Sequence, residues 1–272
     1  MINSNNFIEK LTEIGISQAE IKDLFTYRYN IDYNQVLTGR LYMMPEKAEM
    51  DIEVLKRGYP SAYILGFVNF FGMKINVTNK VLIPRPETEE LVTIIMEQNK
   101  RTLVNTALDL CTGSGCIALS LKKIFPHAKV YASDISPYAI QVAQNNAEEN
   151  KLEIYLAISN YLEYFVKQNI KVDYIACNPP YIPNNATLDK SLSYEPQIAL
   201  FGGPDGLDAY RMIFKDLDTV LIDHGVAIFE VESTLAQDIV LLAKESLPRF
   251  SSEIIKDMSG KERFIKFSKN VL

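Results

Sequence analysis

The sequence has few of the residues that bind structural metals or form disulfides. Its 272 residues include two histidines and three cysteines, Cys111, Cys116 and Cys177, and none of them has a partner at zinc-like spacing. A zinc site and a disulfide framework are therefore excluded as organising features, and we predict no bound metal. An odd number of cysteines without a pairing pattern fits a reducing compartment, so we expect a cytoplasmic protein.

Positive charge and long apolar runs are also scarce. The chain has 28 Lys and Arg residues against 34 Asp and Glu residues, a net charge of −6. Binding to free duplex DNA depends on a positive field that neutralises phosphates, so we expect no direct nucleic-acid partner. The sequence has no window of membrane-spanning length, and no basic segment followed by an apolar core at its start. We therefore predict no membrane partner and no secretion.

What is present is a globular composition with a change of pattern along the chain. Apolar residues make up 47% of the sequence, enough for one large domain or two unequal ones. The first sixty residues look helical, because Phe7 and Leu11 share a face and Ser17 with Glu20 forms a capping box. Residues 62–81 then change to a β-like pattern interrupted by glycine, which we interpret as a hairpin connector.

Beyond residue 84 the pattern alternates between helices and strands, which predicts a mostly parallel sheet. The last two strands flank a short Ser-Gly-Lys-Glu turn, as in an antiparallel hairpin. The strands that we expect are residues 106–110, 129–133, 154–157, 172–177, 225–231, 253–258 and 263–267.

A glycine-containing loop follows the first of these strands at residues 109–115, DLCTGSG. Strand ends that lead into a helix are where open α/β sheets bind ligands, and glycines let backbone N–H groups approach closely. Asp134 ends the next strand, 19 residues after Gly115, and is suited to accept hydrogen bonds from ribose hydroxyls. A dinucleotide-binding dehydrogenase also fits this loop. Asp109 favours instead a nucleoside that carries an amino group.

Residues 178–181, NPPY, follow a later strand and form the most informative motif. Two consecutive prolines end the strand as a stiff extended turn. The Asn178 side-chain oxygen and the Pro179 carbonyl can each accept one N–H of a planar NH₂ group, beside the aromatic ring of Tyr181. Such a turn can hold an amino group for alkylation, although an Asn-Pro-Pro sequence can also simply end a strand.

Taken together, these motifs resemble those of S-adenosylmethionine methyltransferases that alkylate exocyclic or amide nitrogens. Within that group the chain resembles the release-factor glutamine N5-methyltransferases, the PrmC/HemK family. The matching segments are residues 58–66 (GYPSAYILG), 84–89 (PRPETE) and 194–207 (YEPQIALFGGPDGL). The likeness extends from about residue 57 to residue 230. Family members commonly have Gly at the position of Cys111 and Trp at that of Tyr161.

The resemblance implies an α/β class I S-adenosylmethionine-dependent methyltransferase with a seven-stranded sheet, mostly parallel with an antiparallel last hairpin. It implies a helical substrate-recognition domain at residues 1–66, a β-hairpin linker at 67–83 and a catalytic domain at 84–272. The reaction would be methylation of the glutamine amide in a Gly-Gly-Gln segment of peptide chain release factors by a monomer. The implied catalytic residues are Asn178, Pro179, Pro180 and Tyr181. The implied cofactor contacts are Asp109, Cys111, Thr112, Gly113, Ser114, Gly115, Asp134, Tyr161 and Asn178.

Several alternatives remain open at this point. An N6-adenine DNA methyltransferase, a methyltransferase of another protein, a nicotinamide dehydrogenase and a non-catalytic cofactor-binding module share parts of the pattern. Residues 84–89 can be a helix start or a pocket wall. Residues 202–206 can be an ordinary turn before a helix or a loop over the site.

Overall fold

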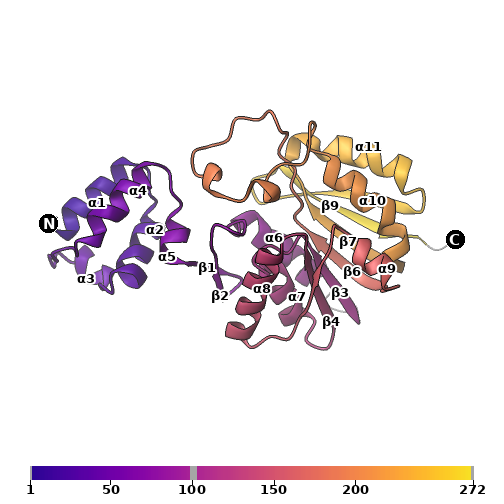
Figure 1. Ribbon diagram of the computed structural model, residues 1–272, viewed down its shortest axis with the longest axis horizontal. Coiled ribbons are helices and arrows are strands. Elements are labelled where there is room, and N and C mark those ends of the chain that lie inside the picture. The colour runs from indigo at the N-terminus through magenta and orange to yellow at the C-terminus, as the bar shows by residue number, and fades with distance from the viewer. Residues whose placement is uncertain (1, 99–102, 271–272) are drawn as a thin grey trace. The chain divides into compact units, whose positions relative to one another are not determined.

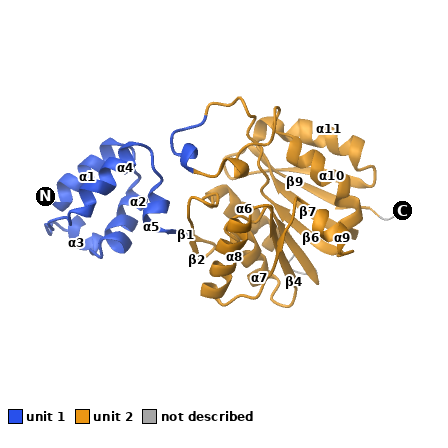
Figure 2. Cartoon of the chain, in the orientation of Figure 1, with its two compact units in different colours: residues 1–68, 188–194 blue, residues 69–187, 195–272 orange. Residues whose placement is uncertain are grey.

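The computed structural model describes residues 2–98 and 103–270. The chain divides into two compact units, one of residues 1–68 with 188–194 and one of residues 69–187 with 195–272 (Figure 2). The division falls within a two-stranded hairpin, β1 (Phe67–Phe70) and β2 (Met73–Asn76). None of the helices in the described ranges combines the length and apolar composition needed to cross a membrane.

The smaller unit is helical and has its own core. The predicted capping box is confirmed, since the Ser17 hydroxyl accepts from the Glu20 N–H and a Glu20 carboxylate oxygen accepts from the Ser17 N–H. Phe7 packs edge-on against Phe25 and Tyr29 inside this core. The helices are α1 (Ser4–Glu13), α2 (Gln18–Asp23), η1 (Leu24–Arg28), α3 (Tyr33–Leu37), α4 (Lys47–Lys56), α5 (Ser61–Leu65) and η2 (Leu192–Tyr194).

The expectation of β structure from residue 62 onward is wrong for residues 62–65, which lie in α5 (Ser61–Leu65). Pro60 precedes this helix in an extended conformation, and Gly66 ends it with a φ of 82° while its N–H bonds the Ala62 carbonyl. Glycine adopts this left-handed conformation without steric cost, so the helix stops there and the hairpin begins at Phe67.

The larger unit is built on one mixed sheet. Within the described residues it has seven strands in the order β5-β4-β3-β6-β7-β9-β8, and β9 alone runs opposite to the other six. The prediction of a parallel sheet closed by an antiparallel hairpin is therefore confirmed. The strands are β3 (Thr106–Leu110), β4 (Lys129–Asp134), β5 (Tyr155–Ile158), β6 (Val172–Cys177), β7 (Leu221–Glu230), β8 (Phe250–Lys256) and β9 (Glu262–Lys269).

Helices cover both faces of this sheet (Figure 1). One face carries α6 (Pro86–Gln98), α7 (Cys116–Ile124) and α8 (Pro137–Asn150), and the other carries α9 (Glu163–Lys167), α10 (Asp208–Val220) and α11 (Ala236–Ser246). Two 3₁₀ turns, η3 (Gln197–Ala199) and η4 (Ser233–Leu235), lie in the connections.

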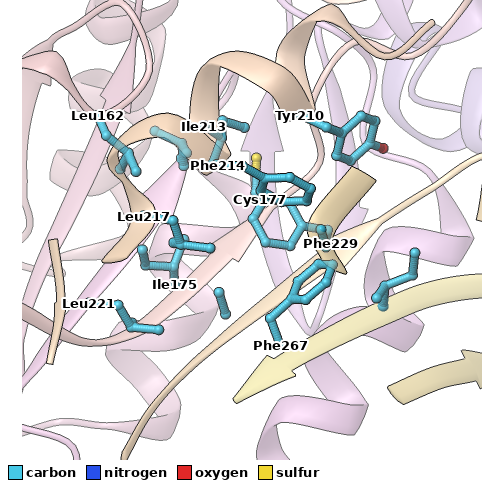
Figure 3. Close-up of a cluster of buried hydrophobic side chains, with 14 of the residues drawn as sticks. Leu162, Ile175, Cys177, Tyr210, Ile213, Phe214, Leu217, Leu221, Phe229 and Phe267 are labelled. Carbon is cyan, nitrogen blue, oxygen red and sulfur yellow. The ribbon is translucent and has the colours of Figure 1, made fainter. Parts of the chain in front are cut away.

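The core under α10 is dense and aromatic. Phe214 packs edge-on against Phe229 and Phe267, and Cys177 at the end of β6 is fully buried in the same cluster (Figure 3). Because these side chains fix the end of β6, the residue that follows Cys177 leaves the sheet at a defined position.

The strand order places a switch point at the centre of the sheet. The chain moves outward from β3 to β4 and β5, then returns to place β6 on the other side of β3. In such sheets the loops after the two central strands diverge and leave a crevice for a ligand. Here those loops begin at Cys111 after β3 and at Asn178 after β6.

Candidate active site

The loop after β3 is bent by residues with positive φ. Cys111, Gly113 and Gly115 have φ values of 63°, 52° and 84°. A Cβ at Gly115 would lie 3.0 Å from the Ala143 Cβ on α8, so the loop also needs glycine to pack there. The loop thus brings its backbone to the end of the sheet and then enters α7.

Asp109 forms hydrogen bonds with this loop and with the helix that follows it. One of its carboxylate oxygens accepts from the Thr112 hydroxyl at 2.5 Å and from the Ala118 N–H at 2.9 Å. The other oxygen is buried and has no hydrogen-bond partner among the described residues. Burial raises the pKa of Asp109 to about 7, against the lowering effect of these two bonds. An unpartnered buried oxygen is costly, which fits a site completed by a ligand or water.

Asp134 ties the end of β4 to the same loop. Its two oxygens accept from the Gly113 N–H at 3.0 Å and the Ser136 N–H at 2.9 Å. Burial raises the pKa of Asp134, while the backbone N–H donors lower it. Each carboxylate oxygen can accept more than one hydrogen bond, so Asp134 can still bind hydroxyl groups of a ligand.

Residues 178–181 leave β6 beside these two loops. The Asn178 side-chain nitrogen donates to the Thr88 hydroxyl at 3.3 Å, and Pro179 is buried. Tyr181 packs against the hydrophobic cluster, and burial raises the pKa of its hydroxyl. Its predicted part as an aromatic wall for the substrate stays a prediction.

A glycine segment covers this turn. The Ile182 N–H donates to the Leu200 carbonyl and the Gly202 N–H donates to the Ile182 carbonyl, both at 2.9 Å. A Cβ at Gly202 would lie 2.5 Å from the Pro180 carbonyl oxygen. The segment packs onto the NPPY turn and leads into α10, as the turn interpretation predicts, while the loop over the site stays a prediction.

Gly202→Ala tests this packing. We expect the free energy of unfolding to fall by about 1–3 kcal/mol, because the new methyl group overlaps the Pro180 carbonyl. Chemical denaturation of the variant and of the wild type measures the difference. An unchanged stability of Gly202→Ala would mean that the segment does not press on the turn.

The buried carboxylate of Glu195 joins two segments next to the pocket. Glu195 is 4% exposed and accepts from the Ile83 N–H at 2.9 Å and from the Arg85 guanidinium. It therefore holds the chain before α6 against the segment before η3. Residues 86–89 form the first turn of α6, as the helix-start interpretation predicts, whereas the neighbouring residues that line the pocket are Lys80, Val81 and Leu82.

These loops line a pocket at the carboxyl ends of the central strands. The predicted site residues that line it are Cys111, Gly113, Asp134, Tyr161, Asn178 and Pro180. The predicted residues that lie outside its lining are Asp109, Thr112, Ser114, Gly115, Pro179 and Tyr181.

Part of the pocket lining comes from residues that were not predicted. Ile135 and Ser136 line the pocket directly after Asp134, and their position at a strand end was a signal for them. Ser159 and Asn160 follow β5 in the same way. Ile198 comes from η3, far along the chain, and no local pattern indicates its place.

The residues present fit S-adenosylmethionine. Asp134 lines the pocket, and its carboxylate oxygens can accept further hydrogen bonds from hydroxyl groups of a ligand. Ile135 and Tyr161 offer apolar surface for a base. The pocket therefore offers acceptor oxygens and apolar surface of the kind that a nucleoside needs.

Comparison with known proteins agrees with this geometry. The family model "Methyltransferase small domain" matches residues 88–193. Similar solved structures include a methyltransferase from Pyrococcus furiosus, with 21% identity, a TM-score of 0.54 and coverage of 74% of this chain and 91% of that one. Another is the 16S rRNA N2 G1207 methyltransferase of Thermus thermophilus in complex with AdoMet and guanosine, with 18% identity, a TM-score of 0.54 and coverage of 75% and 50%. These likenesses concern the fold, which is that of class I methyltransferases.

Sequence relatives extend over nearly the whole chain. The release factor glutamine methyltransferase of Streptococcus pneumoniae is 34% identical over 96% of this chain and 95% of its own length. That of Flavobacterium psychrophilum is 36% identical over the same shares, 96% and 95%. The cofactor of the chain is S-adenosylmethionine, which the Thermus thermophilus structure also contains. The chain belongs to the release factor glutamine methyltransferase family.

Proposed function

We propose that the protein transfers a methyl group from S-adenosylmethionine to the side-chain amide nitrogen, N5, of the glutamine in a Gly-Gly-Gln segment of a peptide chain release factor. The names of its relatives support this substrate. The observation that carries the proposal is that Asn178 lines the same pocket as Gly113 and Asp134. An acceptor for an amide group in the pocket that would hold the nucleoside supports the proposal.

One group of pocket residues would bind the cofactor. In the proposal, Asp134 accepts from the ribose hydroxyls, the backbone at Cys111 and Gly113 borders the methionine end, and Tyr161 borders the adenine. The bound cofactor supplies an electrophilic methyl group on a sulfonium. The loop residues outside the pocket lining would keep the loop in shape, and these are Thr112, Ser114 and Gly115.

The turn after β6 holds the nucleophile. The Asn178 side-chain oxygen and the Pro179 carbonyl each accept one N–H of the glutamine amide, which aims its nitrogen at the methyl group. An amide lone pair is delocalised into its carbonyl, so alignment carries much of the rate, and it can contribute roughly 7–11 kcal/mol. The two acceptors also stabilise the positive charge that grows on nitrogen, and the proton then leaves to water.

We further propose that the helical unit recognises the body of the release factor. It has a separate core, and several large apolar side chains are exposed on it, with Leu41 58% and Met43 61% exposed. The protein would act as a monomer in the cytoplasm, where translation ends. Its net charge of −6 gives no reason for direct contact with nucleic acid.

Replacing both Leu41 and Met43 with glutamate tests the recognition surface. We expect KM for an intact release factor to rise about five- to thirtyfold, because charged side chains replace apolar contacts at the interface. Transfer to a short Gly-Gly-Gln peptide should stay the same, since the peptide has no body to dock. Steady-state kinetics on both substrates measure the difference. Equal losses on peptide and protein would contradict the assignment.

Tritiated S-adenosylmethionine distinguishes the candidate functions. The protein is incubated with a release factor, with the same factor carrying Gln→Ala in its Gly-Gly-Gln segment, and with adenine-containing duplex DNA. The proposal predicts label in the unaltered factor alone. Label in DNA would favour an N6-adenine DNA methyltransferase, and equal label in both factors would indicate another residue or another protein substrate.

A further inference from the structure

Three side chains from separate parts of the sequence form a hydrogen-bonded chain behind the amide site. The Asn178 side-chain nitrogen donates to the Thr88 hydroxyl at 3.3 Å, and that hydroxyl donates to a Glu230 carboxylate oxygen at 2.7 Å. Thr88 lies in the first turn of α6, and Glu230 is the last residue of β7. Thr88 is 3% exposed and Glu230 2%, so water does not compete for these bonds.

The sheet register explains why these residues meet. Cys177 of β6 pairs with Phe229 of β7, so Asn178 and Glu230 are the next residues along the two neighbouring strands. Thr88 is placed by the start of α6 and contacts both. The contact is therefore built into the fold and does not depend on a mobile loop.

The chemistry of these three side chains fixes the direction of each hydrogen bond. An ionised carboxylate only accepts, so the single hydroxyl proton of Thr88 goes to Glu230. The hydroxyl oxygen can then only accept, and Asn178 must offer its NH₂ group to it. The carboxamide is planar with NH₂ and oxygen on opposite branches. Its oxygen is therefore left for a partner in the pocket that Asn178 lines.

We propose that Thr88 and Glu230 are positioning residues that select the orientation of the Asn178 carboxamide in which its oxygen accepts from the substrate amide. This inference rests on the proposed function. The reversed orientation would present NH₂ to NH₂, two donors that cannot bond. The two orientations differ by one rotation of the carboxamide. The hydrogen bonds from Asn178 to Thr88 and from Thr88 to Glu230 therefore decide which orientation has the lower energy.

Protonation of Glu230 favours the opposite orientation of the Asn178 carboxamide. A protonated carboxyl group can donate to the Thr88 oxygen, which frees the Thr88 proton to point at Asn178 and favours the wrong orientation. Burial raises the pKa of Glu230 to about 7, so the ionised form predominates only above that pH. The charged or titratable groups around it are Arg85, Glu87, Cys116, Tyr181, Tyr210, Glu232 and Arg263.

Kinetics with matched variants test the proposal. We expect Thr88→Val to lower kcat for the release factor about ten- to a hundredfold, as when one buried hydrogen-bond partner of a reacting group is lost. The Kd for S-adenosylmethionine should change less than about threefold, since Thr88 does not line the pocket. Thr88→Ser keeps the hydroxyl and should restore kcat. A Thr88→Val protein that folds and turns over at the wild-type rate would overturn the proposal.

The pH profile gives a second kinetic readout. At saturating cofactor, kcat of the wild type should fall below about pH 7 as Glu230 is protonated. Glu230→Gln cannot ionise and should lose this limb. Asp109 also titrates near pH 7, but its titration should act on cofactor affinity, which saturation removes. Persistence of the limb in Glu230→Gln would contradict the assignment.

Nuclear magnetic resonance tests the orientation without any substrate. The Asn178 side-chain NH₂ signals, identified by their loss in Asn178→Ala, should shift in Thr88→Val and keep their positions in Thr88→Ser. They should also titrate near pH 7 in the wild type and not in Glu230→Gln. These signals keep the inference testable if the release factor is not the substrate. Signals that are unchanged in Thr88→Val would overturn it even in an active enzyme.

Discussion

Asn178→Ala should lower kcat for the release factor by about 100- to 1,000-fold, the range found when one preorganised hydrogen-bonding group at a reacting centre is removed. The lost side-chain oxygen grips the target amide and has no contact with the sulfonium in the proposed mechanism. The Kd for S-adenosylmethionine should therefore change little. Single-turnover kinetics at saturating substrates measure the chemical step.

Asn185→Ala is the matched control, because Asn185 is exposed and lies seven residues beyond Asn178. It should keep wild-type kcat. Asn178→Gln retains the amide but moves it by one methylene, and it should recover little activity if alignment decides the rate. Turnover near the wild-type value in a folded Asn178→Ala protein would contradict the amide-clamp mechanism.

Asp134→Ala should weaken S-adenosylmethionine binding by about ten- to a hundredfold for each charge-assisted bond that is lost. The substitution also removes the acceptor of the Gly113 N–H, so the glycine loop loses its tie to β4. Both effects act on the cofactor site and not on the amide acceptors. Isothermal titration calorimetry gives the change in Kd directly.

Asp238→Ala controls for the removal of one negative charge from the larger unit, since Asp238 is exposed in the first turn of α11. It should leave the Kd unchanged. Asp134→Asn separates charge from size, because the carboxamide retains only one acceptor oxygen. Unchanged affinity in a folded Asp134→Ala protein would remove Asp134 from the ribose site.

The central strands were predictable because buried parallel strands carry a simple signal. The expected ranges 106–110 and 172–177 agree with β3 and β6, which are apolar and almost completely buried. Helix α5 was missed because residues 63–65 form a short apolar run that fits either a strand or a helix. The flanking residues favour the short helix, because Pro60 is extended directly before it and Gly66 ends it with a positive φ.

The site was predictable only in its local parts. Residues 109–115, Asp134 and residues 178–181 are recognisable because each follows a strand and has a composition suited to ligands. The bonds from Thr88 to Asn178 and to Glu230 join residues 90 and 142 positions apart, and no local pattern indicates them. The packing of Gly202 on Pro180 likewise depends on the folded arrangement.

Tandem mass spectrometry of a release factor after incubation with the protein and S-adenosylmethionine locates the transferred methyl group. The peptide with the Gly-Gly-Gln segment should gain the mass of one methylene, and fragmentation should place it on the glutamine side-chain nitrogen. Asn178→Ala run in parallel should leave that peptide unmodified. A methyl group on any other atom of the factor, or an unmodified peptide with the active wild-type protein, would contradict the account.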